Sequence, residues 1–507
     1  MARRNLYLSK SKLVSAWQCP KRLHLEKHHP ELGETSSSTE ALFAVGNQVG
    51  EIAQQLYGTH ESIEVPYTRR LSVAIRQTIE LIEGGARFPI FEATLQHDGV
   101  LVRVDVLLPD GDDWRVIEVK ASTSVKDVHI VDCAIQYWVL RNVGLKLQSI
   151  ALAHINNQFV YRGDGDYAGL IVEVDVTERV LELVDSVPEL VAKARVAISG
   201  AVPDVPVGAH CSSPYDCQFQ AHCWPMDTEY PLSGLRGSKD TLGEWVAAGR
   251  RDIRDVDGDC ISSANQQRIH RVTCAGQPEV LDGARKAIEA LAYPRYYLDF
   301  ETIGPAVPIW AGTRPYASVP IQWSCHIDAG PIDDSPEDLR HEEFLDLSGE
   351  PPMRALAMKM IDCLGTSGPI LMYTNYEKQV IVGLTTLFPD LTEPLQKIID
   401  RLVDLHTIVK NHYYHPKMLG SWSLKAVSPA VAPHMDYSNL AGINEGVAAS
   451  EGYLEAIHPE TIPERKAELE EQLLRYCRFD TEAMVEIVRF FRDHDPGLPL
   501  ANIPGRP

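Results

Sequence analysis

The sequence lacks a long apolar run and contains few cysteines. No stretch of about 18 or more consecutive apolar residues occurs, so no membrane-spanning helix and no membrane partner is expected. The first residues, MARRNLYLSKSKLV, lack the apolar core of a secretory signal peptide. Ten cysteines in 507 residues are too sparse for a fold held by disulfides. Together these absences predict a cytoplasmic protein.

Positive charge is also scarce. The chain has 48 Lys and Arg against 70 Asp and Glu, a net charge of -22, which argues against a basic protein that wraps nucleic acid. The first 30 residues are the exception, because Glu26 alone opposes seven basic residues: Arg3, Arg4, Lys10, Lys12, Lys21, Arg22 and Lys27. Any nucleic acid is therefore expected to bind in narrow basic channels, with a steep dependence on salt.

Composition and pattern divide the chain into four blocks of an α/β protein. Residues 1–225 combine a basic N-terminal helix with alternating, strand-like segments, and 226–292 form short helices. The middle block is faintly similar to a helix-hairpin-helix that grips phosphates, and a packing linker is the alternative. Residues 293–494 open with a strand and close with a periodic helix, and the proline-rich tail 495–507 is expected to be unordered.

Two strand-like segments in the first block carry acids and a lysine. In LVRVDVLL and WRVIEVKAS, alternation places Glu118 and Lys120 on one face, and the hairpin between the segments can bring Asp105 beside them. Converging carboxylates repel unless a cation lies between them, and Mg2+ or Mn2+ is the natural occupant. Lys120 could then orient a metal-bound water or offset charge on a phosphate oxygen. An ordinary surface hairpin is the alternative.

The surrounding residues complete a recognisable order. Glu92 precedes the hairpin and Gln136-Tyr137 follows it, so the order E, D, ExK, QY resembles the PD-(D/E)XK nuclease superfamily, and specifically the RecB-like nucleases with an iron-sulfur cluster. The resemblance implies a restriction-endonuclease-like domain over 1–225. In it Asp105 and Glu118 would be metal ligands, Lys120 the catalytic lysine, Gln136 a supporting residue and Glu92 a further candidate acid.

The early helix departs from that family. Many relatives carry a histidine four residues after a glycine, where this chain has Gly50. Glu51 beside it is the second-choice substitute.

Three cysteines cluster in a loop-like segment. Cys211, Cys217 and Cys223 lie in HCSSPYDCQFQAHCWP, and three thiols require a fourth to complete a tetrahedral or cluster site. The RecB-like resemblance supplies Cys19 as the fourth ligand and implies a 4Fe-4S cluster that closes the domain like a clasp. Zinc, or no metal, is the alternative.

A second set of acids lies in the C-terminal half. In RYYLDFETI, alternation places Asp299 and Glu301 on one face of an otherwise apolar strand. In the helix YCRFDTEAMVEIVRFF, Asp480 extends the apolar stripe, and Tyr476 precedes it by one turn. Because buried acids are costly unless they bind something, this set also predicts a cation. The alternative is that Asp480 is a partly exposed acid at a helix start.

The pairing of D-x-E with Y-x3-D resembles the RNase H-like DnaQ superfamily of 3'-5' exonucleases, in its DEDDy branch. In ILMYTNYEKQVIVGL, Glu377 stands where the family usually has aspartate, and Asp404 is a second-choice ligand. The resemblance implies two divalent ions held by Asp299, Glu301, Glu377 and Asp480, with Tyr476 orienting the attacking water. The products would be mononucleotides released from a 3' end.

The whole order resembles a bacterial family known mainly as a domain of unknown function, which fuses the two nuclease types. The leading hypothesis is a metal-dependent nuclease with two active sites that acts on DNA ends or single strands, in repair or defence against foreign DNA. DNA is favoured over RNA as partner, and a helicase would be a separate protein. The alternatives are an RNA-processing 3'-5' exonuclease and a nucleic-acid-binding scaffold with one or both sites decayed.

Overall fold

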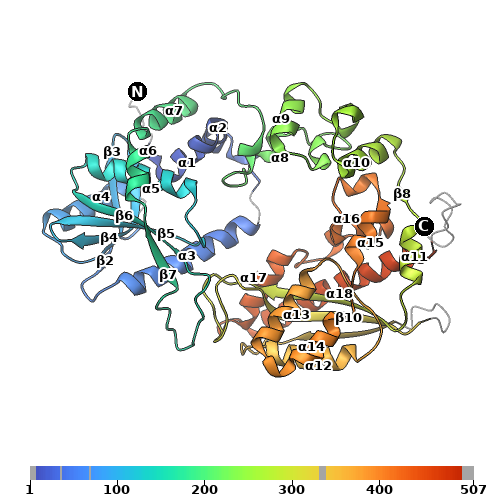
Figure 1. Ribbon diagram of the computed structural model, residues 1–507. Coiled ribbons are helices and arrows are strands. Elements are labelled where there is room, and N and C mark those ends of the chain that lie inside the picture. Colours follow the sequence, from blue (N-terminus) through green and yellow to red (C-terminus); the bar gives the residue numbers. More distant parts are fainter. Residues whose placement is uncertain (1–6, 35–36, 68–69, 331–338, 494–507) are drawn as a thin grey trace. The chain divides into compact units, whose positions relative to one another are not determined.

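A computed structural model describes residues 7–34, 37–67, 70–330 and 339–493 of the chain. The tail 495–507, expected to be unordered, lies outside the described residues. Contacts divide the chain into two compact units (Figure 1). Unit 1 comprises Met1–Trp224, Lys239–Ala247 and Pro305–Tyr316, and unit 2 comprises Pro225–Ser238, Ala248–Gly304 and Ala317–Pro507. Both contain helices and a mixed sheet, which confirms the α/β class.

Unit 1 is built on one mixed sheet. Its strands follow the order β2 (Ile63–Glu64), β3 (Ile90–His97), β4 (Val100–Asp110), β5 (Asp113–Lys120), β6 (Leu147–Ile155) and β7 (Ile171–Asp175), with β1 (Leu8–Ser9) paired to β4. The β3-β4-β5 meander and the β6-β7 pair are antiparallel, whereas β5 and β6 run parallel. A parallel pair requires a crossover, and the intervening helix α5 (Asp127–Asn142) provides it.

Unit 1 contains further helices besides α5. They are α1 (Lys10–Gln18), α2 (Pro20–His28), α3 (Ser37–Tyr57), α4 (Leu71–Glu83), α6 (Thr177–Val184), α7 (Val187–Ser199), α8 (Gln220–Cys223) and α9 (Lys239–Ala247). The main core joins α5 residues such as Ile135 and Val139 to the sheet residues Val102, Val116 and Leu152. Burial of α5 along most of its length explains why it shows no strong amphipathic pattern in the sequence.

A segment from the second half of the chain completes unit 1. Ala306 and Val307 are buried in a small core with Ile52 of α3 and with Ile155 and Leu170. Further along the segment, the backbone N–H of Gly312 donates to the carbonyl of Tyr161 at 2.8 Å, and that of Tyr161 donates to Thr313 at 3.0 Å. The fold of unit 1 therefore uses residues that lie far beyond its main stretch of sequence.

Unit 2 contains a five-stranded sheet and a short two-stranded one. The larger sheet has the order β11 (Leu339–Leu345), β10 (Val319–Asp328), β9 (Arg295–Ile303), β12 (Ile370–Met372) and β13 (Leu402–Asp404). The pairs β11-β10 and β10-β9 are antiparallel, and β9-β12 and β12-β13 are parallel. Strand β14 (Tyr413–Tyr414) pairs with β8 (Glu279–Val280).

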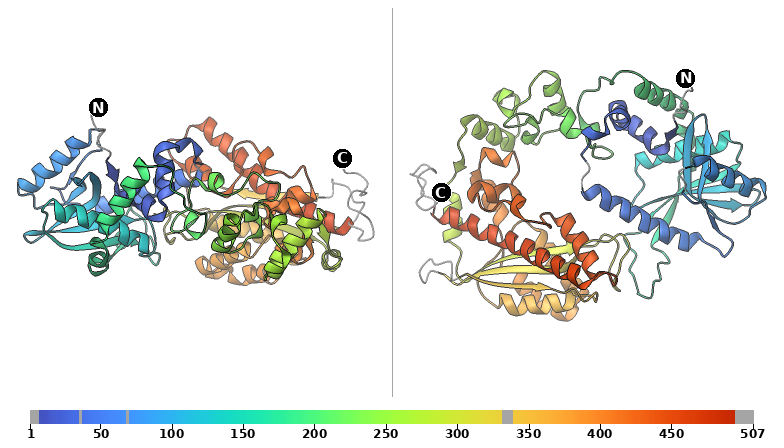
Figure 2. Two further views of the ribbon diagram at one scale, coloured as in Figure 1. Left: turned by 90° about the horizontal axis from the view of Figure 1, so that it is seen from above. Right: turned by 180° about the vertical axis from the view of Figure 1, so that it is seen from behind.

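Unit 2 contains helices on both faces of its larger sheet and others beyond it (Figure 1). They are α10 (Ala264–Ala275), α11 (Gly283–Glu289), α12 (Met353–Leu364), α13 (Tyr376–Leu387), α14 (Thr392–Ile399), α15 (Leu405–His412), α16 (Leu424–Val431), α17 (Gly446–Ile457) and α18 (Pro463–Asp493). On β10, Gln322 donates to the Leu473 carbonyl of α18, and the next residue, Trp323, donates to the Leu356 carbonyl of α12. Neighbouring strand residues face opposite sides, so α18 and α12 lie on opposite faces, as Figures 1 and 2 show.

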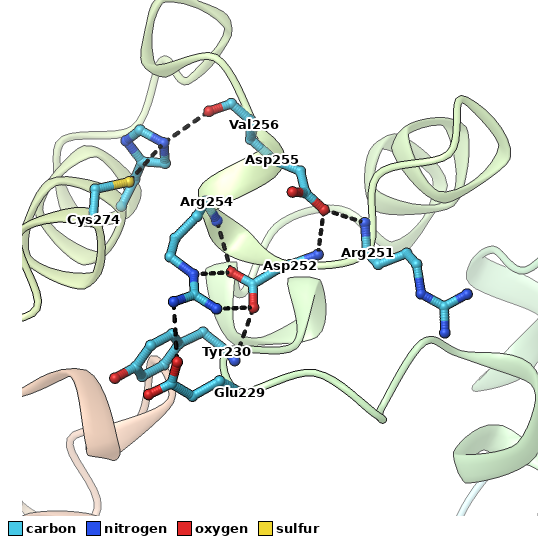
Figure 3. Close-up of polar contacts among 9 residues, drawn as sticks. Glu229, Tyr230, Arg251, Asp252, Arg254, Asp255, Val256 and Cys274 are labelled. Atoms are coloured by element: carbon cyan, nitrogen blue, oxygen red, sulfur yellow. Dashed lines mark hydrogen bonds and ion pairs between the residues drawn. The ribbon is translucent and has the colours of Figure 1, made fainter.

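The middle block is organised by a polar network within unit 2. The Asp252 carboxylate accepts hydrogen bonds from the Arg254 side chain at 2.8 Å and from the backbone N–H of Tyr230 at 3.1 Å, and Arg254 also donates to Glu229 at 3.0 Å (Figure 3). This network folds the 3-10 turn Ile253–Asp255 onto the preceding segment. The Arg254 guanidinium is therefore engaged by two acids, Asp252 and Glu229.

The described residues contain no helix that is both long and apolar enough to cross a membrane.

Candidate active sites

The acid-lysine cluster of unit 1 forms at the end of β5, opposite α5. Strand alternation directs Val116, Glu118 and Lys120 toward α5, and Val116 belongs to the core that α5 covers. Strands β4 and β5 are paired from the turn between them as far as Val106 and Ile117, where the pairing ends. Beyond that point the Asp105 carboxylate accepts a hydrogen bond from the backbone N–H of Val119 at 2.7 Å. The strands thus separate where the acids lie.

One buried carboxylate is the centre of this cluster. Glu118 accepts from Lys120 at 2.5 Å and from Lys10 at 2.7 Å on one oxygen, and from Gln136 at 2.5 Å on the other. Lys120 also donates to Asp132 at 2.6 Å. The structure therefore brings together Glu118, Lys120 and Gln136 of the sequence prediction, with Asp105 held by the adjacent backbone.

Charge in this cluster is largely balanced by ammonium groups. Burial would raise the pKa of Glu118, but Lys10 and Lys120 lower it well below its ordinary value. Burial and the Glu118 charge raise the pKa of Asp105 to about 7. Glu118 and Asp132 share two lysines, and the Asp105 carboxyl is a third acid beside them that a divalent cation could bind.

Two other predicted residues, Glu92 and Glu51, have surroundings that differ from those of this cluster. Glu92 is on β3 as expected, but its carboxylate forms an ion pair with Arg103 at 3.0 Å, and burial raises its pKa. Glu51 is exposed on α3. A role for Glu51 as a ligand would require it to reach the cluster from that exposed position.

Sequence reasoning missed Lys10 and Asp132 as members of this cluster. Asp132 had a usable signal, because it precedes Gln136 by four residues and therefore shares its face of α5. Lys10 had none, because it lies 108 residues from Glu118 and reaches it only through the packing of α1. That contact also removes Lys10 from the basic cluster expected to bind nucleic acid.

The rest of the basic N-terminal cluster is partly engaged as well. Arg22 donates to Glu26 at 2.8 Å, and Lys21 lines the cysteine cavity. Arg3 and Arg4 lie outside the described residues. Fewer positive charges are therefore available for phosphates than the count of the first 30 residues indicates.

The four predicted cysteines line one cavity. Cys19, at the junction of α1 and α2, faces Cys211, Cys217 and Cys223 across a small cavity of about 20 Å³, and all four thiols are free. Burial raises the pKa of Cys19, Cys217 and Cys223. Four free thiols from two distant segments form the donor set that an iron-sulfur cluster or zinc takes, so these residues fit such a group.

The acids of unit 2 gather on the face of the sheet that α18 covers. Asp299 pairs in register with Ser324 of β10, and the Ser324 hydroxyl lies 2.9 Å from that of Thr481 on α18. Glu301, Glu377 and Asp480 are buried, and Asp299 is half-buried. Strand β9 therefore supplies two acids, the start of α13 the third and α18 the fourth.

Burial, with neighbouring charges, raises the pKa values of these carboxyl groups. Burial, then the charges of Asp480, Glu377 and Glu301, raise the pKa of Asp299 well above its ordinary value. Burial also raises the pKa of Glu377 to about 8 and that of Asp480 to about 7. Four neighbouring acids, three of them buried and one half-buried, are an arrangement that can bind divalent metal.

Aromatic side chains and one lysine border this group. Tyr437 donates a hydrogen bond to Asp480, and burial and the Asp480 charge raise the pKa of Tyr476. The Lys425 ammonium lies 5.2 Å from the ring centre of Tyr476 and 5.1 Å from that of Tyr437. Tyr437 and Lys425 were not predicted, because no spacing relative to the acids distinguishes them in the sequence.

Asp404, the second-choice ligand, caps a helix. Its carboxylate accepts from the backbone N–H of Thr407 at 3.1 Å and from the Thr407 hydroxyl at 2.7 Å, at the start of α15. Asp404 nevertheless lies at the end of β13, in register with Met372 of β12, near the start of α13 where Glu377 sits. These two hydrogen bonds make Asp404 the N-cap of α15.

Comparisons with known proteins agree with part of this picture. A family model described as a domain of unknown function (DUF2779) matches residues 296–423, which include Asp299, Glu301, Glu377 and Asp404. The uncharacterized protein MG366 of Mycoplasma genitalium is 26% identical over 218 residues, which cover 39% of this chain. The match spans 32% of the length of that relative. The residues matched by the family model span the five strands of the larger sheet of unit 2, from β9 to β13.

Proposed function

We propose that the protein is a metal-dependent nuclease with two active sites, one in each unit, that hydrolyses phosphodiester bonds of DNA ends or single strands. One observation carries this proposal. Three separate elements bring four acids together in a mostly buried cluster: Asp299, Glu301, Glu377 and Asp480. Buried acids at such density require a counter-ion, and divalent ions between carboxylates are the usual solution in phosphodiester hydrolysis. Repair, or defence against foreign DNA, is the proposed setting.

The sheet of unit 2 supports an RNase H-like, DEDDy-type assignment. Three antiparallel strands followed by two parallel ones, with the D-x-E strand in the centre, agree with that fold. The four acids would hold the divalent ions, which when bound supply a Lewis acid for the phosphate and an activated water. Tyr476 would orient the attacking water with its hydroxyl, and Lys425, beside its ring, helps to fix the ring position.

The cluster of unit 1 supports a PD-(D/E)XK-type assignment. Asp105 and Glu118 would hold a divalent ion, and Gln136 fixes one Glu118 oxygen by its hydrogen bond. The Lys120 ammonium would stabilise negative charge that develops on a phosphate oxygen. Cys19, Cys211, Cys217 and Cys223 would hold a 4Fe-4S cluster with a structural role, since it would join α1 and α2 to the segment after α7.

The exposed position of Glu51 favours a second candidate for unit 1 alone. Without a ligand from α3, that unit would bind nucleic acid as a scaffold and leave cleavage to unit 2. An RNA-processing 3'-5' exonuclease is the alternative for unit 2, because the acid cluster by itself does not distinguish a ribose from a deoxyribose.

Degradation of end-labelled substrates tests the proposal. The protein is purified without oxygen and incubated with single- and double-stranded DNA and RNA in Mg2+ or Mn2+. We expect Asp299→Asn to stop mononucleotide release from 3' ends, Asp105→Asn to stop the remaining cleavage, and the double variant to be inactive. A wild type that degrades nothing would contradict the proposal, cleavage unchanged in Asp105→Asn would support the scaffold, and cleavage of RNA alone would support RNA processing.

Metal analysis tests the cysteine site separately. We expect iron and sulfide in the wild type, their loss in Cys217→Ser, and their retention in Cys260→Ser, because Cys260 is exposed and free. Stoichiometric zinc in place of iron would contradict the cluster.

A further inference from the structure

A fully buried thiol lies among the acids of unit 2. Cys477 follows Tyr476 on α18, and its sulfur is 3.9 Å from the Oδ2 atom of Asp299. The sulfur, a carboxylate oxygen of Asp299 and one of Glu301 all lie within 4.8 Å of one another. The proposed hydrolysis gives this thiol no role, although it lies beside two of the carboxylates that would hold the catalytic ions.

The spacing of these atoms suits an ion that accepts sulfur. Zinc binds thiolate sulfur at about 2.3 Å and carboxylate oxygen at about 2.1 Å, so tetrahedral geometry places the two atoms about 3.6 Å apart. The observed 3.9 Å therefore requires a shift of only a few tenths of an ångström. Mg2+ takes oxygen ligands and would not recruit the sulfur.

A second observation points to a missing ligand at the same place. Glu377 is 2% exposed, and its Oε2 atom is buried with no hydrogen-bond partner among the described residues. The Glu377 carboxyl also interacts with that of Asp299. An unpartnered buried carboxylate oxygen is unfavourable until it meets a ligand, so Glu377 can complete the set.

We propose that Asp299, Glu301 and Cys477 form a mixed carboxylate-thiolate site that binds a thiophilic divalent ion of the Zn2+ class in competition with Mg2+. The thiol proton passes to water as the sulfur-metal bond forms. This inference rests on the proposed function, since the same carboxylates would hold the catalytic ions. Bound Zn2+ would hold the acids in a tetrahedral arrangement and inhibit the exonuclease.

Cadmium NMR on the full chain, with its cysteine cluster loaded, tests the site independently of activity. A site with one sulfur resonates apart from a site with four, so any cadmium taken up in unit 1 is distinguished. We compare Cys477→Ser, which keeps the size of the side chain but replaces sulfur with oxygen, with Cys325→Ser. Cys325 is equally buried but pairs with Leu298, which directs it to the opposite face of the sheet.

We expect the wild type and Cys325→Ser to show a one-sulfur cadmium resonance that Cys477→Ser lacks. Cadmium affinity should fall at least about tenfold in Cys477→Ser, because even outer partners of metal ligands contribute 10- to 100-fold. Retained Mn2+ binding by Cys477→Ser would show that its acids are still in place. Absence of the resonance from the wild type, or its persistence in Cys477→Ser, would overturn the inference.

Two further outcomes separate this inference from the proposed function. Zn2+ should inhibit Mg2+-dependent cleavage by the wild type at lower concentration than cleavage by Cys477→Ser. If the wild type shows the cadmium resonance but cleaves nothing, the metal site stands and the nuclease proposal fails. If it cleaves DNA without the resonance, the nuclease proposal stands and this inference fails.

Discussion

The two acid clusters differ in how their negative charge is compensated. In unit 1, Glu118 and Asp132 share the ammonium groups of Lys10 and Lys120, and the pKa of Glu118 is lowered. In unit 2 four carboxylates face one another, and their pKa values rise. Lysines keep Glu118 of the first cluster ionised, whereas the second cluster is compensated by protons or by metal. Unit 2 should therefore depend more strongly on divalent ions.

The largest expected effect concerns Lys120, which contacts the central carboxylate of the unit 1 cluster. We expect Lys120→Gln to slow the cleavage assigned to unit 1 at least about 100-fold, as loss of a catalytic proton-transfer or charge-stabilising group does. The Asp299→Asn variant should retain only the cleavage assigned to unit 1. The rate at which this background releases the labelled end therefore measures that cleavage alone. Lys146→Gln, at an exposed position, is the matched control. Full activity of Lys120→Gln would remove the catalytic distinction between the clusters.

Stability should also depend on the lysines of unit 1. We expect Lys10→Met to destabilise unit 1 by about 3 kcal/mol, because it leaves buried Glu118 and Asp132 with one ammonium between them. Urea denaturation followed by hydrogen exchange in α5 measures the change. Lys27→Met, on the exposed part of α2, should have little effect. An equally stable Lys10→Met protein would show that Lys10 does not compensate the acids.

Glu118 of unit 1 and the buried acids of unit 2 should respond to pH in opposite directions. Without metal, the folded-state pKa values of Asp480, about 7, and Glu377, about 8, exceed the ordinary values of 3.8 and 4.5. Their contribution is fully present below the ordinary values and is lost as pH rises through 7 to 8. The lowered pKa of Glu118 has the opposite sign, so its contribution is present above the ordinary value and is lost as pH falls below it.

Thermal unfolding of the metal-free protein between pH 6 and 9 checks the prediction for unit 2. We expect its Tm to fall with pH, and Mg2+ or Mn2+ to reverse that fall by binding the ionised acids. Asp480→Asn should flatten the profile. An unchanged slope in Asp480→Asn would contradict the assignment of the pH effect to this cluster.

The smallest expected effect concerns Asp404. We expect Asp404→Ala to destabilise unit 2 by about 1 kcal/mol through the loss of an N-cap, and Asp404→Asn to have almost no effect, because asparagine also caps helices well. Both variants should retain exonuclease activity, measured as mononucleotide release. Inactivity of Asp404→Asn would instead make Asp404 a metal ligand, as the sequence also allowed.

Much of each candidate site followed from short-range pattern. Alternation in β5 and β9 placed Glu118 beside Lys120 and Asp299 beside Glu301, and helical spacing aligned Tyr476 with Asp480. The repeat of a strand or helix is a local property of the backbone, so it can be read from the sequence. The three clustered cysteines were equally visible. These elements could be predicted without knowledge of any contact between them.

Tertiary structure alone decided the partners of those residues. The contacts of Lys10 with Glu118, of Tyr437 with Asp480 and of Cys477 with Asp299 join positions 108, 43 and 178 residues apart. The inclusion of Pro305–Tyr316 in unit 1 is of the same kind. Such contacts depend on which apolar faces pack together, and that choice is made by the whole chain. The sequence by itself therefore determined which acids share a face, and packing determined what neutralises them.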